Sequence, residues 1–347
     1  MKSIESEDVR LRELSAWLLS DDVVNAVGRS VGEGVLAPAS SDASFRRYFR
    51  ITHRGGTFIA MDAPPPQENC RPFVRIAKMM AAAGLNTPRV YAEDLERGFL
   101  LLTDMGLQTY LDVANESNVD GLMRDATDAL VKWQLATVPG ELPPYDEAVL
   151  RREISLFPDW YISKHLQLTL NPQQQVALDS VFSQVIASNL AQQRVYVHRD
   201  FMPRNLMVSS PNPGVLDFQD ALIGPIGYDI ACLWRDAFAS WEEERILDGT
   251  VRYWEKAKKA GLPVPDDFGA FYRDVEWMAL QRHLKVMGIF ARINYRDGKP
   301  RYLADTPRFA RYVRKCCERY SELFPLARLF DQLNIDDGLT RTTGVSF

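Results

Sequence analysis

One short segment constrains the fold of this chain more than any other. Residues 195–218 read VYVHRDFMPRNLMVSSPNPGVLDF, a β-rich stretch between long segments of helical periodicity. Its apolar runs end abruptly in polar residues, which include Asp200, Asn205 and Asp217. Two short strands are therefore expected to bring these three side chains to neighbouring strand ends.

The three residue types match the needs of phosphoryl transfer. A carboxylate at Asp200 can deprotonate an acceptor hydroxyl, while Asn205 and Asp217 can hold magnesium against nucleotide phosphates. The run HRDFMPRN has the spacing of the kinase catalytic loop, H-R-D-x-x-x-x-N, and the DF of VLDFQD stands where D-F-G is expected. A lone H-x-D is more often a hydrogen-bonded turn, so the prediction depends on the combination. It makes Asp200 the catalytic base and Asn205 and Asp217 the metal ligands, with ATP and Mg²⁺ as cofactors, and His198 a packed strut.

The pattern on either side of this segment predicts an α+β, two-lobed, protein-kinase-like fold. Residues 1–105 combine an N-terminal amphipathic helix with antiparallel strands and one helix at 70–84, and are expected to form a small ATP-binding lobe. Residues 106–347 are expected to form a larger, mainly helical lobe with the catalytic loop and the acceptor site. Its expected helices span 118–137, 146–166, 171–193, 228–258 and 267–294.

The segment after Asp217 is too short for a protein kinase. Gly224 and Pro225 follow within a few residues, and a helical pattern then begins. No room is left for a phosphorylatable activation loop, so a small-molecule acceptor is expected.

Two kinase features are missing from the first 105 residues. No G-x-G-x-x-G is present; SSDASFRRYF occupies that hairpin, as a phosphate-binding loop or as a plain polar turn. The lysine of V-A-I-K is also missing, because FIAMDA stands in its place. Candidate nucleotide contacts are Ser44, Arg46 and Arg50. Arg46, Arg47 or Arg50 could supply the positive charge of the missing lysine, and strand alternation places Arg46 and Arg50 on one face and Arg47 on the other, with either face open as the one that meets the nucleotide.

A second group of nucleotide contacts is expected where the lobes join. FLLLTDMG can form the hinge, with the backbone of Leu102, Thr103 and Asp104 bonding the adenine edge. A buried strand that ends in a helix cap is the alternative. Glu68, before the helix at 70–84, is a candidate for the glutamate that pairs with the missing lysine.

Three stretches resemble the aminoglycoside phosphotransferase/choline kinase family: VHRDFMPRNLM, GVLDFQDALIGPIGYDIACLWRD and GFLLLTDMG. ISLFPDWYISKHL and LKVMGIFARINYRDGKPRYLADTPR extend the resemblance to a bacterial branch of anomeric sugar kinases of cell-wall recycling. The resemblance implies ATP, magnesium and a kinase-like fold. The narrower branch implies phosphorylation of the anomeric hydroxyl of N-acetylmuramate or N-acetylglucosamine, to give a sugar 1-phosphate.

The charge distribution bears on the acceptor. Residues 282–319 hold eleven Lys and Arg against three acids, in a chain whose net charge is −5. This excess suits a neutral or carboxylate-bearing sugar better than a polycationic aminoglycoside. A solvated helix face is the alternative for any single arginine, and core packing is the alternative for Trp160 and Tyr161. The candidate sugar contacts are Trp160, Arg235, Asn294, Arg296 and Arg301, the last three in a stretch that looks loop-like.

The remaining properties exclude several classes of protein. The acidic net charge argues against a nucleic-acid partner, and no apolar run approaches the roughly 18 residues that cross a membrane. The four cysteines lack zinc or disulfide spacing, and the N-terminus does not read as a signal peptide. A cytoplasmic monomer is expected. A kinase of aminoglycosides or choline, and a catalytically inactive nucleotide-binding pseudokinase, stay open as alternatives.

Overall fold

The computed structural model describes residues 8–41, 45–53 and 56–335, and it divides into two compact units. The first runs to Ala114 and includes Asn205–Asp220; the second comprises Asn115–Arg204 and the chain from Ala221 onward. The predicted division at residues 105–106 therefore differs from the observed one mainly in where residues 205–220 belong. The hairpin that carries Asn205 and Asp217 belongs with the N-terminal unit.

A five-stranded antiparallel sheet forms the centre of the first unit. Its strands are ordered β1-β2-β3-β5-β4. The bounds are β1 Val35–Ser41, β2 Arg47–His53, β3 Gly56–Asp62, β4 Val90–Asp94 and β5 Phe99–Thr103. The β-branched and aromatic residues of RYFRITH and FLLLT favour these strands. The sheet confirms the predicted antiparallel architecture.

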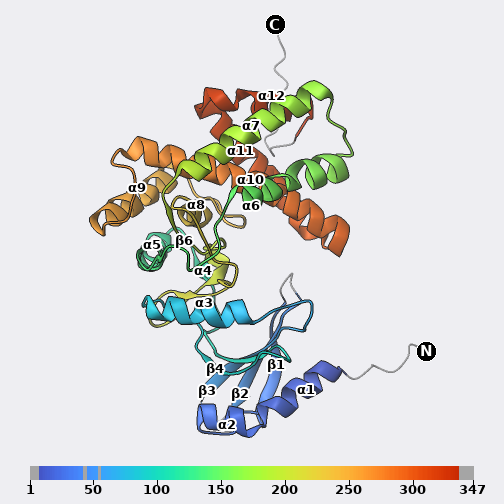
Figure 1. Ribbon diagram of the computed structural model, residues 1–347, viewed down its shortest axis with the longest axis vertical. Helices are drawn as coiled ribbons and strands as arrows, with labels where there is room; N and C mark the ends of the chain where they lie inside the picture. Colours follow the sequence, from blue (N-terminus) through green and yellow to red (C-terminus); the bar gives the residue numbers. More distant parts are fainter. Residues whose placement is uncertain (1–7, 42–44, 54–55, 336–347) are drawn as a thin grey trace, which may run out of the picture. The chain divides into compact units, whose positions relative to one another are not determined.

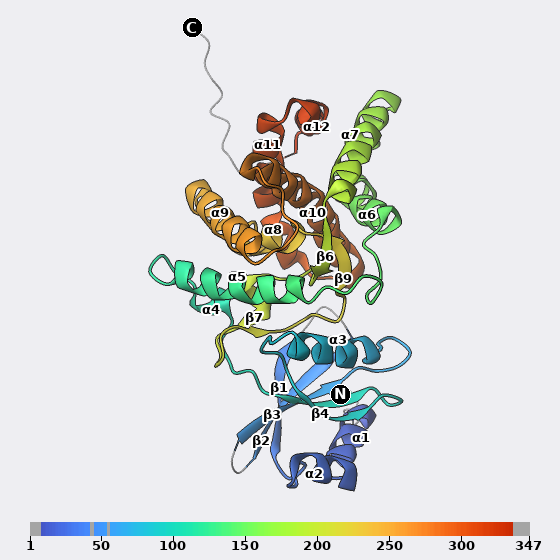
Figure 2. The ribbon, with the colours of Figure 1, turned by 60° about the vertical axis from the view of Figure 1, so that its left-hand side comes forward.

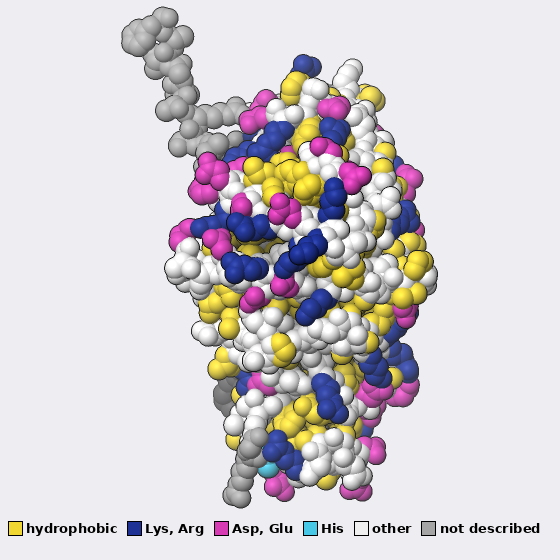
Figure 3. Space-filling view, turned by 90° about the vertical axis from the view of Figure 1, so that its left-hand side faces the viewer, with side chains coloured by type: hydrophobic (Ala, Val, Ile, Leu, Met, Phe, Trp, Pro, Cys, Tyr) yellow, Lys and Arg dark blue, Asp and Glu magenta, His cyan; other side chains and the backbone are white. Residues whose placement is uncertain are grey.

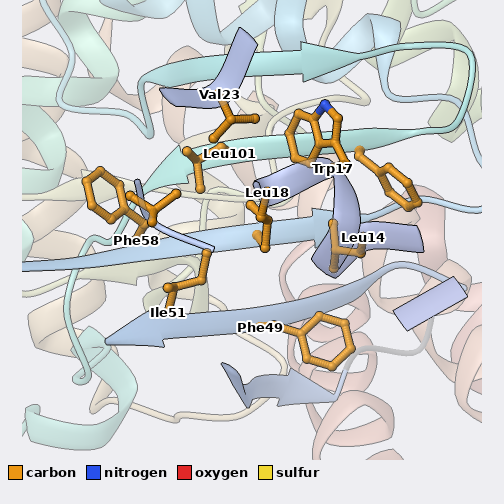
Figure 4. Close-up of a cluster of buried hydrophobic side chains, with 11 residues drawn as sticks. Leu14, Trp17, Leu18, Val23, Phe49, Ile51, Phe58 and Leu101 are labelled. Carbon is orange, nitrogen blue, oxygen red and sulfur yellow. The ribbon is translucent and has the colours of Figure 1, made fainter. Parts of the chain in front are cut away.

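Helices cover both faces of this sheet (Figure 1). Helices α1 (Val9–Leu18) and α2 (Asp21–Val27) pack on one face, where side chains of alternate strand positions join a common core. Figure 4 shows Leu14, Trp17 and Leu18 directed at the strands. Helix α3 (Arg71–Ala82) lies along the opposite face and buries Phe73 and four other apolar residues.

The hairpin of β7 (Leu206–Met207) and β8 (Gly214–Val215) attaches to the first unit through its backbone. The N–H of Val208 donates to the carbonyl of Gln108 at 2.9 Å, and that of Val215 donates to Asn86 at 2.8 Å. The buried ring of Phe218 lies 4.8 Å from the ring of Phe73 on α3. These contacts explain why the hairpin groups with the N-terminal sheet rather than with the helices that flank it in sequence.

The second unit is mainly helical, with one short antiparallel pair, β6 (Arg194–Val197) and β9 (Leu222–Pro225). Figure 2 shows α10 running through the middle of the helices. The long helices are α5 Val119–Leu135, α7 Pro172–Ala191, α9 Glu243–Lys259, α10 Phe268–Asp297 and α11 Thr306–Arg319. Shorter helices are α4 Tyr110–Val113 in the first unit, and α6 Glu147–Ile154, α8 Tyr228–Trp234 and α12 Phe324–Gln332 in the second.

Two of the predicted helices are broken. The helix expected over 228–258 ends as α8 and resumes as α9, because the buried carboxylate of Asp236 takes the backbone N–H groups of Ala237 and Ala239. Such side-chain to backbone bonds compete with helical ones. The helix expected over 146–166 is α6 followed by a π-helix, η1 (Phe157–His165).

The stretch expected to be a loop near residue 294 is helical instead. Helix α10 continues to Asp297, Gly298 ends it at φ +68°, and a 3₁₀ helix follows over Pro300–Asp305. Periodicity alone placed the end three residues early. A left-handed glycine after the last turn is the usual end of a helix.

Charged groups of both signs are interspersed on the face shown in Figure 3, with hydrophobic groups between them. Within the described ranges, none of the helices combines the length and the hydrophobicity that crossing a bilayer requires. The four cysteines are buried as free thiols.

Candidate active site

The catalytic-loop sequence follows β6 and is held by a buried carboxylate in the second unit. Asp229, in the first turn of α8, accepts the N–H of His198 at 2.7 Å and that of Arg199 at 3.0 Å. Burial raises the pKa of Asp229 to about 7, against these two N–H donors, which favour its ionised form. Arg199 has φ +78°, a conformation that non-glycine residues adopt at an energetic cost. The two N–H bonds to Asp229 help to hold it there.

His198 is enclosed by the protein. Its side chain is fully buried, its ring packs edge-on against Phe201, and its Nδ1 accepts the N–H of Asp200 at 3.2 Å. This setting fits the predicted strut better than an acid-base group. The ring fixes the backbone of the half-buried Asp200.

The Arg199 side chain is bound from a helix far away in the sequence. Its guanidinium pairs with Glu153 on α6, and Lys285 on α10 donates to the same carboxylate at 3.0 Å. The hydroxyl of Tyr145 also donates to Glu153. Burial disfavours the ionised carboxylate, but the charges of Lys285 and Arg199 outweigh it and lower the pKa of Glu153 to about 2. A buried, fully charged cluster thus stands directly behind the catalytic loop.

Sequence reasoning missed Glu153, Asp229 and Lys285. None of the three lies in the HRD motif, and each reaches the loop only through tertiary contacts. The only sequence signal is Asp229 in GYDIACLWRD, where it precedes an apolar helix as a first-turn acid.

The two predicted metal ligands come together on the hairpin of the first unit. The amide nitrogen of Asn205 lies 3.4 Å from a carboxylate oxygen of Asp217, and the N–H of Leu216 donates to the Asn205 carbonyl at 2.9 Å. Asp217 has φ +63°, and Gln219 donates to its other oxygen at 2.8 Å. Among the described residues, no group of three or more His, Cys, Asp or Glu side chains forms a metal cluster. One carboxylate and one amide suit magnesium, which keeps water and phosphate as its other ligands.

The structure gives the missing lysine a candidate replacement in Arg46. Its guanidinium lies 3.3 Å from the carboxylate of Glu68, and both side chains are largely buried. The N–H of Phe45 donates to the same carboxylate at 3.1 Å. Asp62, one of the two residues in the lysine's place, is fully buried under Arg10 and Arg47 on the face of α1.

Arg50 and Asp104 bind each other. Two bonds of 2.6 and 2.9 Å join them, and Arg50 also donates to the Gly106 carbonyl. The Arg50–Asp104 pair therefore has a structural role at the end of β5, and the nucleotide contact of Arg50 stays a prediction. Ser44 lies outside the described residues.

The expected hinge begins within the sheet. Leu102 is buried in β5 between β3 and β4, and the N–H of Thr103 donates to the Arg89 carbonyl at 3.0 Å. These two residues therefore also match the alternative of a buried strand end. The adenine contact predicted for the backbone of Leu102, Thr103 and Asp104 stays a prediction.

The candidate sugar contacts differ in accessibility. Arg235 is buried and paired with Glu243 and Glu276, so its guanidinium serves an internal ion cluster rather than the predicted sugar site. Trp160 on η1 is half-buried. Its neighbour Tyr161 is buried in the core, which matches the alternative of core packing for Tyr161.

The others lie at and beyond the end of α10. Asn294 is half-buried. Arg296 is exposed and paired with Asp297, and Arg301 is exposed and bonded to the Tyr302 hydroxyl at 3.0 Å. These polar groups stay available as predicted sugar contacts.

An HRD loop held by a buried aspartate, an Asn–Asp pair on a hairpin and a five-stranded antiparallel sheet with a helix on either face define a phosphotransferase of kinase-like fold. The model of the Phosphotransferase enzyme family matches residues 35–268. The chain belongs to this family.

Similar proteins agree with this assignment. The chain is 54% identical to an N-acetylmuramate/N-acetylglucosamine kinase of Pseudomonas putida, over 94% of this chain and 97% of the relative. It is 46% identical to a Neisseria meningitidis kinase of the same name, over 89% and 93% of the two chains. The solved structure of a choline/ethanolamine kinase family protein from Mesorhizobium loti has the same fold, with 15% identity and a TM-score of 0.61 over 92% of this chain and 99% of that one.

Proposed function

We propose that this protein transfers the γ-phosphoryl group of ATP to the anomeric hydroxyl of N-acetylmuramate or N-acetylglucosamine. The main support is the 54% identity to a kinase named for these two sugars, which extends over nearly the whole of both chains. The intact set of Asp200, Asn205 and Asp217 supports an active enzyme over a pseudokinase, because a protein that only binds nucleotide has no chemical need of all three.

The residues take the following roles in this proposal. The Asp200 carboxylate orients the anomeric hydroxyl and accepts its proton as the new oxygen–phosphorus bond forms and the bond to the leaving ADP oxygen breaks. Asn205 and Asp217 would hold magnesium, which neutralises charge on the phosphates when bound. Arg46, oriented by Glu68, supplies the positive charge of the missing lysine.

The product would be a sugar 1-phosphate. A nucleotidyl transfer consumes products of this class, which suits a role in recycling cell-wall sugars. The use of ATP favours a cytoplasmic location.

A substrate panel tests the proposal. The protein is incubated with ATP and magnesium and one acceptor at a time: N-acetylmuramate, N-acetylglucosamine, kanamycin or choline. ADP release and acid-labile anomeric phosphate are measured. We expect both signals with the amino sugars, and their loss with excess chelator. Activity on kanamycin or choline alone would contradict the assignment of an amino sugar as the acceptor. No activity on any acceptor would favour a pseudokinase.

A further inference from the structure

Helix α10 presents a cationic stripe that leads from the catalytic loop to the surface. Lys285, Ile289, Arg292 and Arg296 are spaced by four, three and four residues, which places them along one face of a helix with 3.6 residues per turn. All four lie in the second unit. We call this set the α10 stripe.

The α10 stripe begins beside the catalytic loop. Lys285 donates to Glu153, which also binds Arg199, the residue before Asp200. The side chain of Lys285 is 13% exposed, Ile289 and Arg292 are half-buried, and Arg296 is exposed. The stripe therefore emerges gradually from the interior over about three turns of helix.

The π-helix η1 lies along one side of the α10 stripe. A Cβ at Gly288 would come within 2.3 Å of the Leu156 carbonyl, so α10 meets the start of η1 at close range. Further along, the hydroxyl of Tyr295 lies 3.2 Å from the Nδ1 of His165 at the end of η1. Trp160, a candidate sugar contact, belongs to this same π-helix.

Arg292 differs from the two other cations of the stripe. Lys285 has Glu153 and Arg296 has Asp297 as a carboxylate partner. In the part of the chain that the structure describes, Arg292 makes no ion pair, and its shielded Nε has no hydrogen-bond acceptor. Burial and the positive charge of Arg296 lower the pKa of the Arg292 guanidinium from its usual value, although the carboxylate of Asp297 opposes this shift. A half-buried cation without a directly paired anion is costly and would be stabilised by one.

We propose that Arg292 binds the carboxylate of an acid-bearing acceptor and so determines the preference between a carboxylate-bearing and a neutral amino sugar. In N-acetylmuramate this group is the lactyl carboxylate; N-acetylglucosamine has no such group. The planar guanidinium matches a carboxylate with two parallel hydrogen bonds. This inference rests on the proposed function, because it assigns one specificity to the same acceptor site.

Steady-state kinetics on both sugars test the assignment. A charge-assisted hydrogen bond contributes roughly 1.5–3 kcal/mol, which is about 10- to 150-fold in kcat/KM. Arg292→Gln should lower kcat/KM for N-acetylmuramate by about that factor and leave kcat/KM for N-acetylglucosamine within about twofold. Arg292→Lys should give an intermediate loss, because lysine keeps the charge without the fork.

Three further measurements separate a binding role of Arg292 from a structural one. Arg252→Gln removes an exposed arginine of α9 that pairs with Asp248. It should leave kcat/KM unchanged for both sugars. The melting temperature of Arg292→Gln should equal or exceed that of the wild type, because the substitution removes a half-buried unpaired charge. Esterifying the lactyl carboxylate of N-acetylmuramate should lower kcat/KM of the wild type but not that of Arg292→Gln.

The results distinguish this inference from the proposed function. An equal loss on both sugars, or no loss on either, would overturn the role of Arg292. A wild type that phosphorylates N-acetylglucosamine but not N-acetylmuramate would also overturn it while sparing the kinase assignment. If the wild type phosphorylates neither sugar, the proposed function is wrong; the role of Arg292 is then decided by calorimetric titration with N-acetylmuramate, where equal binding by wild type and Arg292→Gln, or none by either, would overturn it as well.

Discussion

The carboxylate of Glu153 holds the guanidinium of Arg199, so that a residue of α6 fixes the side chain next to Asp200, the proposed base. In protein kinases, a phosphate added to the activation loop orders that loop through arginine pairs. Here a resident carboxylate lies against the arginine of the HRD sequence, and Lys285 completes the cluster. The loop therefore has an ordering contact that needs no phosphorylation.

Removing the Glu153 charge should destabilise the protein and slow catalysis. Glu153→Gln keeps the shape but leaves two largely buried cations without their anion, which typically costs about 3–5 kcal/mol in unfolding free energy. Urea unfolding measures this loss, and kcat should fall about tenfold because Asp200 is less well oriented. Glu147→Gln, in the same helix but exposed and paired with Arg151, is the control and should change stability by less than about 1 kcal/mol. Equal stability of the two variants would contradict this role.

The same cluster predicts a pH dependence of stability. The folded-state pKa of Glu153 is lowered to about 2 from an ordinary value near 4.5. Its contribution of about 3 kcal/mol is therefore complete above pH ~4.5 and is lost progressively as the pH falls toward 2. The gap in unfolding free energy between wild type and Glu153→Gln should be constant from pH 7 to 5.5 and shrink between pH 4.5 and 3. A gap that does not change with pH would show that Glu153 is not the titrating group.

Asp200→Asn should abolish turnover with the fold intact. The amide keeps the size of the carboxylate but cannot accept the proton, so kcat should fall by about 10²–10⁴-fold. Circular dichroism and the dissociation constant of a fluorescent ATP analogue should stay near wild type. Asp248→Asn, an exposed change on α9, serves as the matched control. If Asp200→Asn turned over near the wild-type rate, Asp200 would not be the catalytic base.

Arg46 and Glu68 should act as one unit in ATP binding. Arg46→Gln is expected to raise KM for ATP about tenfold, and Glu68→Gln to raise it less, because Glu68 only orients the arginine. In a double-mutant cycle the two effects should be non-additive by about 0.5–3 kcal/mol. The exposed pair of Arg71 and Glu96 in the same unit should show additivity and no effect on KM. Additive effects of Arg46 and Glu68 would rule out the shared role.

Gly288→Ala should weaken the contact between α10 and the start of η1. The added Cβ would meet the carbonyl carbon and oxygen of Leu156 at 2.3 Å, and backbone atoms cannot move aside cheaply. Overpacking of this kind costs about 1–3 kcal/mol. Gly121→Ala in α5, where nothing lies within 4 Å, should instead be neutral or stabilise by up to about 1 kcal/mol. Thermal or urea unfolding compares the two, and equal stabilities would contradict the close packing.

Local patterns were sufficient to predict most of the helices and strands. The period-2 and helical-period runs predicted the sheet and the long helices, and the fixed spacing from Asp200 to Asn205 and the DF that follows predicted the site residues. Where side chains competed with the backbone, prediction failed. Asp236 interrupts the helix expected over 228–258, and periodicity carries no signal of such a bond.

The sequence by itself determined which residues can perform phosphoryl transfer, because spacing within one short segment fixes the order of base, amide and second carboxylate. Only the tertiary structure decided what holds them. The pairing of β2 and β3 places Arg47 opposite Asp62, and the two side chains form an ion pair on the sheet face that α1 covers. Arg46 instead pairs with Glu68. The ion cluster behind the loop joins Arg199 of the loop itself to Glu153 of α6 and Lys285 of α10, which lie 46 or more residues away from it in the sequence. Ion pairs between distant segments depend on how helices pack, and no local pattern of residues encodes that.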